Sequence, residues 1–208
     1  MIGRHLSALQ VVVPLIAAPA CVILYRPHLA WGLAALVNWL GFAMAIALLS
    51  QVLAEGPISY PLGGWAAPWG IEYRIDLVNA FVLLIVTGIS AMVVLFAHAS
   101  VKREIPEDRI YLFYTCWLLC VTGLLGITVT GDAFNLFVFL EISSLSSYAL
   151  ISLNPDRRAF TAAYRYLVMG TIGATLKSPC FHYTRGCRMR IPMHLRRSLP
   201  CWRQRRPK

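Results

Sequence analysis

The sequence predicts an all-α polytopic membrane protein with about six transmembrane helices. Hydrophobic residues make up 58% of the 208 residues, and the mean hydropathy is +0.64. Long apolar runs recur along the chain, and runs of about 18 residues or more are typical of membrane spans rather than of a soluble core. Backbone polar groups in lipid must bond within their own segment, which favours helices. The predicted spans are residues 7–25, 29–53, 77–98, 110–130, 133–153 and 160–176.

The first span has two features of a secretory signal, a basic start and the sequence Ala-Pro-Ala-Cys at positions 18–21. Its apolar run is longer than the usual signal core of about 7–15 residues, and Pro19 falls where cleavage needs a small residue. Further spans follow directly. We therefore interpret residues 7–25 as an uncleaved first transmembrane helix.

The longest connection between spans runs from Glu55 to Asp76 and is rich in Gly, Pro and Trp. Such a composition does not continue a helix. Alternation between Trp69 and Asp76 predicts a short β-ribbon at the membrane surface. Trp65 and Trp69 are expected to anchor this connection at the membrane–water interface.

The basic residues of the loops predict the orientation, because short cytoplasmic loops carry an excess of Lys and Arg. Two of these residues, Arg4 and Arg74, lie on the side of the N-terminus. Six lie on the opposite side: Arg26, Lys102, Arg103, Arg109, Arg157 and Arg158. The N-terminus is therefore expected outside, with the loops at 99–109 and 154–159 in the cytoplasm.

The net charge of +10 comes from the C-terminal segment alone. Residues 1–176 carry equal numbers of basic and acidic side chains, whereas residues 177–208 carry ten basic side chains and no acidic one. This distribution argues against a nucleic-acid-binding protein. After six helices the tail would emerge outside, against the positive-inside rule. We therefore divide the chain into a truncated transmembrane domain, 1–176, and a basic tail, 177–208, which we expect to be out of frame or disordered. Reading the DNA past codon 176 in the other frames tests this.

Glu141 is the strongest candidate functional residue, because it lies near the middle of the apolar span 133–153. A charge at the bilayer centre costs about 2.5–3.5 kcal/mol on insertion scales, so such a residue usually faces a protein interior or a water path. Helical periodicity places four residues on its face: Phe134, Phe137, Ser144 and Tyr148. The hydroxyls of Ser144 and Tyr148 are candidates to bond the carboxyl or hold water. The alternative role is that of a protonated glutamate joining two helices.

Other polar residues have competing interpretations. Asp132 precedes the span 133–153 and is expected to cap that helix, with a role in proton entry as the alternative. Asp76 is expected to cap residues 77–98 in the same way. The serines at 143, 144, 146 and 147 favour close helix packing, with a water path as the alternative. Arg165 either extends towards the cytoplasmic surface, pairs with Glu141 or faces an internal pathway.

Two motifs resemble a known family. GDAFNLFVFLEISSLSSYAL, followed by PDRRAFTAAYRYLVMGTIGAT, is similar to the D-type subunits of Mrp-type multisubunit monovalent cation/proton antiporters. LGGWAAPWGIEYRID resembles the surface ribbon that leads into the third helix of that family. More broadly, the motifs are typical of the antiporter-like proton-channel subunits of the complex I membrane arm. The resemblance covers residues 6–176.

The resemblance implies a fourteen-helix fold with two inverted five-helix repeats, of which this chain would be an N-terminal fragment. It also implies that a glutamate in the fifth helix pairs with a lysine in the seventh and gates proton movement. Glu141 matches that glutamate, while the lysine would lie beyond residue 176. Asp132, Ser144, Tyr148 and Arg165 are the candidate supporting residues. We expect this fragment to be inactive by itself.

The expected function is that of a transporter subunit in the bacterial inner membrane, exchanging Na⁺ or another monovalent cation for protons. Its expected partners are the other subunits of a hetero-oligomeric antiporter complex, membrane lipid, the cation and protons, with no nucleic acid. The alternative is a proton-pumping membrane-arm subunit of NADH:quinone oxidoreductase, which is non-redox itself. The sequence has neither a CxxC cluster nor a GxGxxG motif, so we expect no cofactor and no metal in this chain.

Overall fold

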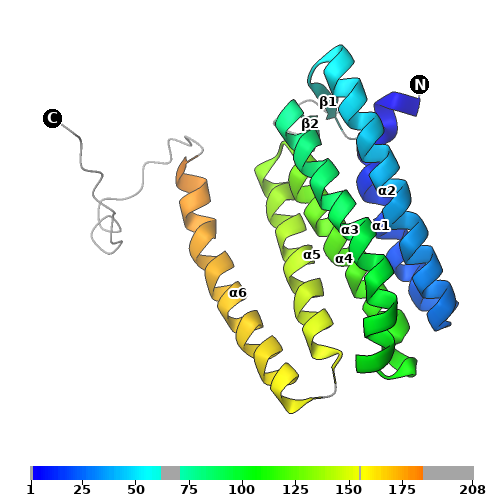
Figure 1. Cartoon of the computed structure of the whole chain (residues 1–208). Coiled ribbons are helices and arrows are strands. Elements are labelled where there is room, and N and C mark those ends of the chain that lie inside the picture. Colours follow the sequence, from blue (N-terminus) through cyan, green and yellow to red (C-terminus); the bar gives the residue numbers. More distant parts are fainter. Residues whose placement is uncertain (1, 62–70, 155, 185–208) are drawn as a thin grey trace, which may run out of the picture. The chain divides into compact units, whose positions relative to one another are not determined.

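The computed structural model describes residues 2–61, 71–154 and 156–184, and the chain divides into two compact units at Val168. The helices are long, and a two-stranded ribbon lies between the second and the third (Figure 1). The elements in chain order are α1 (Ile2–Leu24), α2 (Pro27–Glu55), β1 (Ile58–Pro61), β2 (Glu72–Ile75), α3 (Leu77–Glu104), the 3-10 turn η2 (Glu107–Arg109), α4 (Ile110–Val129), α5 (Ala133–Ser152) and α6 (Arg157–Thr184).

The predicted class, an all-α multi-pass membrane protein, is confirmed. Among the described residues, α1 to α5 are each long and apolar enough to cross a membrane. Helix α6 has 28 residues but is more polar, because it carries arginines in its first half and Lys177 further on. The predicted sixth span is therefore a helix, although it is less apolar than the other five.

The observed helices extend beyond several of the predicted spans. Helix α3 continues to Glu104, six residues past the predicted end, and α6 runs from Arg157 to Thr184 instead of from 160 to 176. A hydropathy pattern marks the part of a helix that lipid surrounds, whereas backbone hydrogen bonds can continue into the polar ends. The division of the chain at residue 176 remains a prediction, and residues 185–208 lie outside the described part.

Helices α1 to α4 pack around two groups of buried side chains. One group lies towards the ribbon and includes Leu48, Leu83 and Leu125, whereas the other includes Cys21, Ala30 and several further small residues. Helix α4 contacts α1, α2, α3 and α5, so it occupies the centre of this arrangement. Helix α5 packs on α4 along one side and joins the bundle mainly through this neighbour.

Two glycines allow α5 to approach α4 closely. A Cβ atom at Gly126 would lie 2.3 Å from the ring of Phe139, and one at Gly123 would lie 2.6 Å from the Cβ of Ser143. Nearby, the Sγ of Cys120 lies 3.4 Å from the Oγ of Ser147. The predicted packing role of the serines is confirmed for Ser143 and Ser147, since both lie in this contact.

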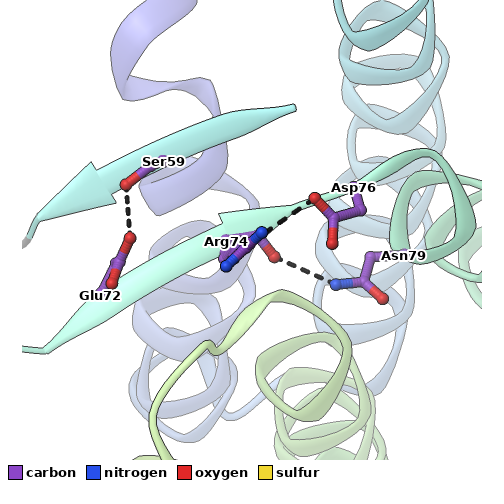
Figure 2. Close-up of polar contacts among 5 residues, drawn as sticks. All are labelled: Ser59, Glu72, Arg74, Asp76 and Asn79. Atoms are coloured by element: carbon purple, nitrogen blue, oxygen red, sulfur yellow. Dashed lines mark hydrogen bonds and ion pairs between the residues drawn. The ribbon is translucent and has the colours of Figure 1, made fainter. Parts of the chain in front are cut away.

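The predicted ribbon is confirmed, and its two strands are antiparallel. Ile58 is paired with Ile75, and the Ser59 hydroxyl donates a 2.5 Å hydrogen bond to Oε1 of Glu72 (Figure 2). The ribbon also touches the turn between α4 and α5, because the Gly131 N–H donates to the Glu72 carbonyl over 2.8 Å. Trp65 and Trp69, the predicted interface anchors, lie outside the described residues.

Replacing Gly126 with Ala should separate α5 from α4. The added methyl group overlaps the Phe139 ring, and overpacking of this kind typically costs about 1–3 kcal/mol. We expect a lower midpoint of thermal unfolding in detergent. Gly32→Ala is the matched control, because a Cβ there meets nothing within 4 Å. Equal midpoints for the two variants would contradict the close-packing account.

Candidate functional site

Glu141 lies near the middle of the 20-residue helix α5, on the side opposite to α4. The α4-facing stripe of α5 follows the i, i+4 spacing of Asn135, Phe139, Ser143 and Ser147. Glu141 is two positions from Phe139, which places it about 200° away around the helix at about 100° per residue. The packing of α5 on α4 therefore directs the carboxylate away from the bundle.

The Glu141 side of α5 is largely uncovered. Phe134 is 74% exposed, Phe137 39% and Leu145 52%. In the most apolar window of α5 only 17% of the residues are buried, against 33–50% in the other four spans. Because exposed apolar residues in a span contact either lipid or another helix, this side is a surface for lipid or for a further protein segment.

Glu141 itself is half-buried, and it forms no hydrogen bond or ion pair with any residue that the structure describes. The predicted supporting hydroxyls do not bond to it. Ser144 is half-buried on the same side, whereas the Tyr148 ring lies edge-on to Tyr166 of α6, with 5.0 Å between the ring centroids. The predicted shared face therefore exists, but its hydroxyls do not hold the carboxyl.

Arg165 does not pair with Glu141: the only ion pair among the described residues joins Arg74 and Asp76. Arg165 is exposed and, with Arg157 and Arg158, lines an open hollow near the beginning of α6. The positions of Arg165 relative to the membrane surface and to an internal pathway stay predictions.

Asp132 and Asp76 occupy the predicted N-cap positions of α5 and α3, with extended backbones, but neither makes a capping hydrogen bond through its side chain. The predicted N-cap positions are therefore confirmed, without side-chain capping bonds. The Asp76 carboxylate lies near Arg74 instead (Figure 2), with 3.7 Å between Oδ1 and Nε of Arg74. The amide of Asn79, in the first turn of α3, donates to the Arg74 carbonyl over 3.1 Å.

The first turn of α5 is held by Thr130 instead. The amide of Asn135 donates to Thr130 Oγ1 over 3.2 Å, and the Asp132 N–H donates to the same oxygen over 3.4 Å. Tyr73 of β2 forms a β-bridge with Thr130. Burial raises the pKa of the Tyr73 hydroxyl, and the contact with Asn135 lowers it by a smaller amount. This cluster attaches the start of α5 to the ribbon at the membrane surface.

Several polar side chains buried within the bundle were not among the predicted site residues. The Gln10 amide donates to the Gly41 carbonyl over 2.9 Å, and the Ser90 hydroxyl donates to Oδ1 of Asn38. Their signal was present in the sequence, since Gln10 and Asn38 interrupt apolar spans. These bonds join α1 to α2 and α2 to α3, and they lie apart from the Glu141 side of α5.

The chain is similar to subunits of NADH-quinone oxidoreductases and of Na⁺/H⁺ antiporters. It is 38% identical over 188 residues to the N-type subunit of the NADH-quinone oxidoreductase of Desulforudis audaxviator, covering 86% of this chain and 35% of the relative. It is 27% identical over 179 residues to the D-type subunit of the Na⁺/H⁺ antiporter of Alkalihalophilus pseudofirmus, covering 83% and 35%. No family model matches the chain.

Two solved structures share the fold. A chain of the membrane-bound sulfane sulfur reductase, an archaeal respiratory membrane complex, matches with a TM-score of 0.73 and 32% identity, over 82% of this chain and 35% of that chain. A chain of the Mrp complex from Dietzia matches with a TM-score of 0.73 and 23% identity, over 84% and 33%. The predicted resemblance is confirmed. The chain spans about a third of the length of these relatives, corresponding to their N-terminal part.

Thr130→Val should loosen the start of α5, because valine keeps the shape but removes the oxygen that Asn135 and the Asp132 N–H use. A lost buried hydrogen bond of this kind costs about 1 kcal/mol. We expect faster amide hydrogen exchange in residues 132–136 than in the unchanged chain. Thr128→Val is the matched control, since its hydroxyl bonds only to the Leu125 carbonyl of its own helix. Unchanged exchange in Thr130→Val would refute this attachment.

Proposed function

We propose that this relative of the antiporter-like membrane subunits is the N-terminal part of a subunit that conducts protons in a multisubunit monovalent cation (Na⁺)/proton antiporter. The observation that carries the proposal is the position of Glu141, a half-buried carboxylate near the middle of α5, turned away from α4. Intramembrane acids are functional in most membrane proteins where they occur. The similarity to the D-type subunit of a Na⁺/H⁺ antiporter supports the choice of function.

The chemistry follows from the two protonation states of a carboxylate in a medium of low polarity. In the proposed cycle the carboxylate accepts a proton from a water path and releases it towards the other side when a lysine approaches. The family resemblance assigns this lysine to a helix that would follow residue 176. A pair that alternates between these arrangements moves protons across the membrane.

The uncovered side of α5 is the place where we expect that downstream segment to pack. Glu141 faces this side, and the exposed Phe134, Phe137 and Leu145 would supply the apolar contacts. We further propose that the N-terminus lies outside a bacterial plasma membrane, because six basic loop residues lie on the opposite side and two on its own. The partners would be the other subunits of a hetero-oligomeric complex.

A second candidate is a proton-pumping membrane-arm subunit of NADH:quinone oxidoreductase. It is supported by the 38% identity over 188 residues to an N-type subunit of that enzyme. Both candidates use the same carboxylate, so the site does not separate them. The neighbouring genes do: small antiporter subunits would support the first candidate, and flavin and iron–sulfur subunits the second.

Glu141→Gln in the full-length protein should abolish cation-dependent proton exchange, because the amide cannot take up and release a proton. The measurement is the collapse of a preformed pH gradient in everted membrane vesicles on addition of Na⁺. The amount of assembled complex should be unchanged.

Glu55→Gln is the matched control, since it removes an exposed carboxylate at the end of α2. Its exchange activity should equal that of the unchanged protein. Full exchange activity in Glu141→Gln would refute the proposed role of this carboxylate.

The 208-residue chain by itself should show no exchange when reconstituted, because the family resemblance assigns the lysine partner of Glu141 to a helix beyond residue 176. The measurement is the same gradient collapse, with the full-length complex as the positive control. Sustained exchange by the chain alone would show that no further segment is needed.

A further inference from the structure

Three arginines surround an open hollow at the beginning of α6. The hollow has a volume of about 440 Å³, and its lining consists of Arg157, Arg158, Thr161, Ala162 and Arg165. These positions lie within one arc of the helix at about 100° per residue. The lining thus combines three long cationic side chains with two small residues.

The positive charge of this hollow is not neutralised by the described part of the chain. The ion pair among the described residues joins Arg74 and Asp76, which lie at the other end of the bundle. The nearest acid in the sequence, Asp156, accepts a hydrogen bond from the Arg158 N–H through Oδ1, over 3.4 Å, and so caps the helix. All three arginines are exposed, and the positive end of the helix dipole adds to their field.

The position of the hollow relative to the membrane is set by α5. That helix ends at Ser152, so the beginning of α6 lies at a membrane surface. Arg165 lies eight residues into α6, which corresponds to ~12 Å along the axis at 1.5 Å per residue. Phe160 and Tyr164 lie next to the arginine arc, and they are 59% and 67% exposed. The arginines would meet the phosphate layer of a phospholipid. The exposed aromatic rings beside them would meet the glycerol groups and the beginning of the acyl chains.

We propose that this hollow binds the phosphate of an anionic phospholipid headgroup. The guanidinium fork matches the geometry of two phosphate oxygens, and three such groups in the lining of one hollow can contact one phosphate. Basic residues beside a membrane span each contribute about fivefold to the affinity for anionic lipid, the equivalent of about 1 kcal/mol. The site does not depend on the proposed antiport function, because it lies at the beginning of α6 and does not include Glu141.

The test measures the binding of phosphatidylglycerol to the purified 208-residue chain by native mass spectrometry in detergent. The triple variant R157Q/R158Q/R165Q should weaken the tightest binding about 100-fold, as three factors of about five multiply. The matched control, R203Q/R205Q/R206Q, removes the same charge from the tail and should leave this binding class unchanged. Thr161→Leu keeps every charge but places a larger side chain in the lining of the hollow, and it should also weaken binding.

Circular dichroism and gel filtration establish whether each variant is folded. If the triple variant is not folded, lipid binding by Thr161→Leu tests the proposal. Millimolar inorganic phosphate should fail to displace the lipid, because the proposed ligand is held in the membrane. An equal loss in the tail variant, unchanged binding in both hollow variants, or displacement by inorganic phosphate would each overturn the proposal.

Discussion

The close approach of α5 to α4 determines the orientation of the candidate site. Gly123 and Gly126 leave no room for side chains, and Phe139 and Ser143 occupy the space. A helix seated on these contacts has one rotation, and in that rotation Glu141 points to the opposite side. Had α5 packed through the face of Glu141, the carboxylate would lie against α4 and be inaccessible to any later segment. The glycines thus position a charged group that they do not touch.

The ribbon supports the same arrangement from the membrane surface. Its second strand bonds to Gly131, and Thr130 holds the first turn of α5 through Asn135. These bonds fix the position of α5 along its axis, whereas the glycine contact fixes its rotation about that axis. A carboxylate near the middle of a span has a high free-energy cost of insertion, and such groups usually have a function. This favours a role in proton movement over a purely structural role. The same placement would suit either proposed function, because both proposals load a proton on this carboxylate.

The spans could be predicted because lipid demands long apolar segments, and this demand is visible in each segment separately. The β-ribbon could also be predicted, from alternation before Asp76. Helix ends were less accurate, as α3 shows, because the polar turns beyond the lipid carry no hydropathy signal. The N-cap position of Asp76 could be predicted, but the proximity of its carboxylate to Arg74 could not, because that contact depends on the path of the ribbon. The arginine hollow was not predicted, although the spacing of Arg157, Thr161 and Arg165 already places these residues on one side of a helix.

The most direct test of the account is infrared difference spectroscopy of the full-length complex in lipid bilayers, recorded as a Na⁺ gradient is imposed. A proton-loading role for Glu141 predicts a change in the carbonyl band of a protonated carboxyl, and this change should vanish in Glu141→Gln but persist in Glu55→Gln. A difference band that survives in Glu141→Gln, or a spectrum without any carboxyl change during exchange, would contradict the account.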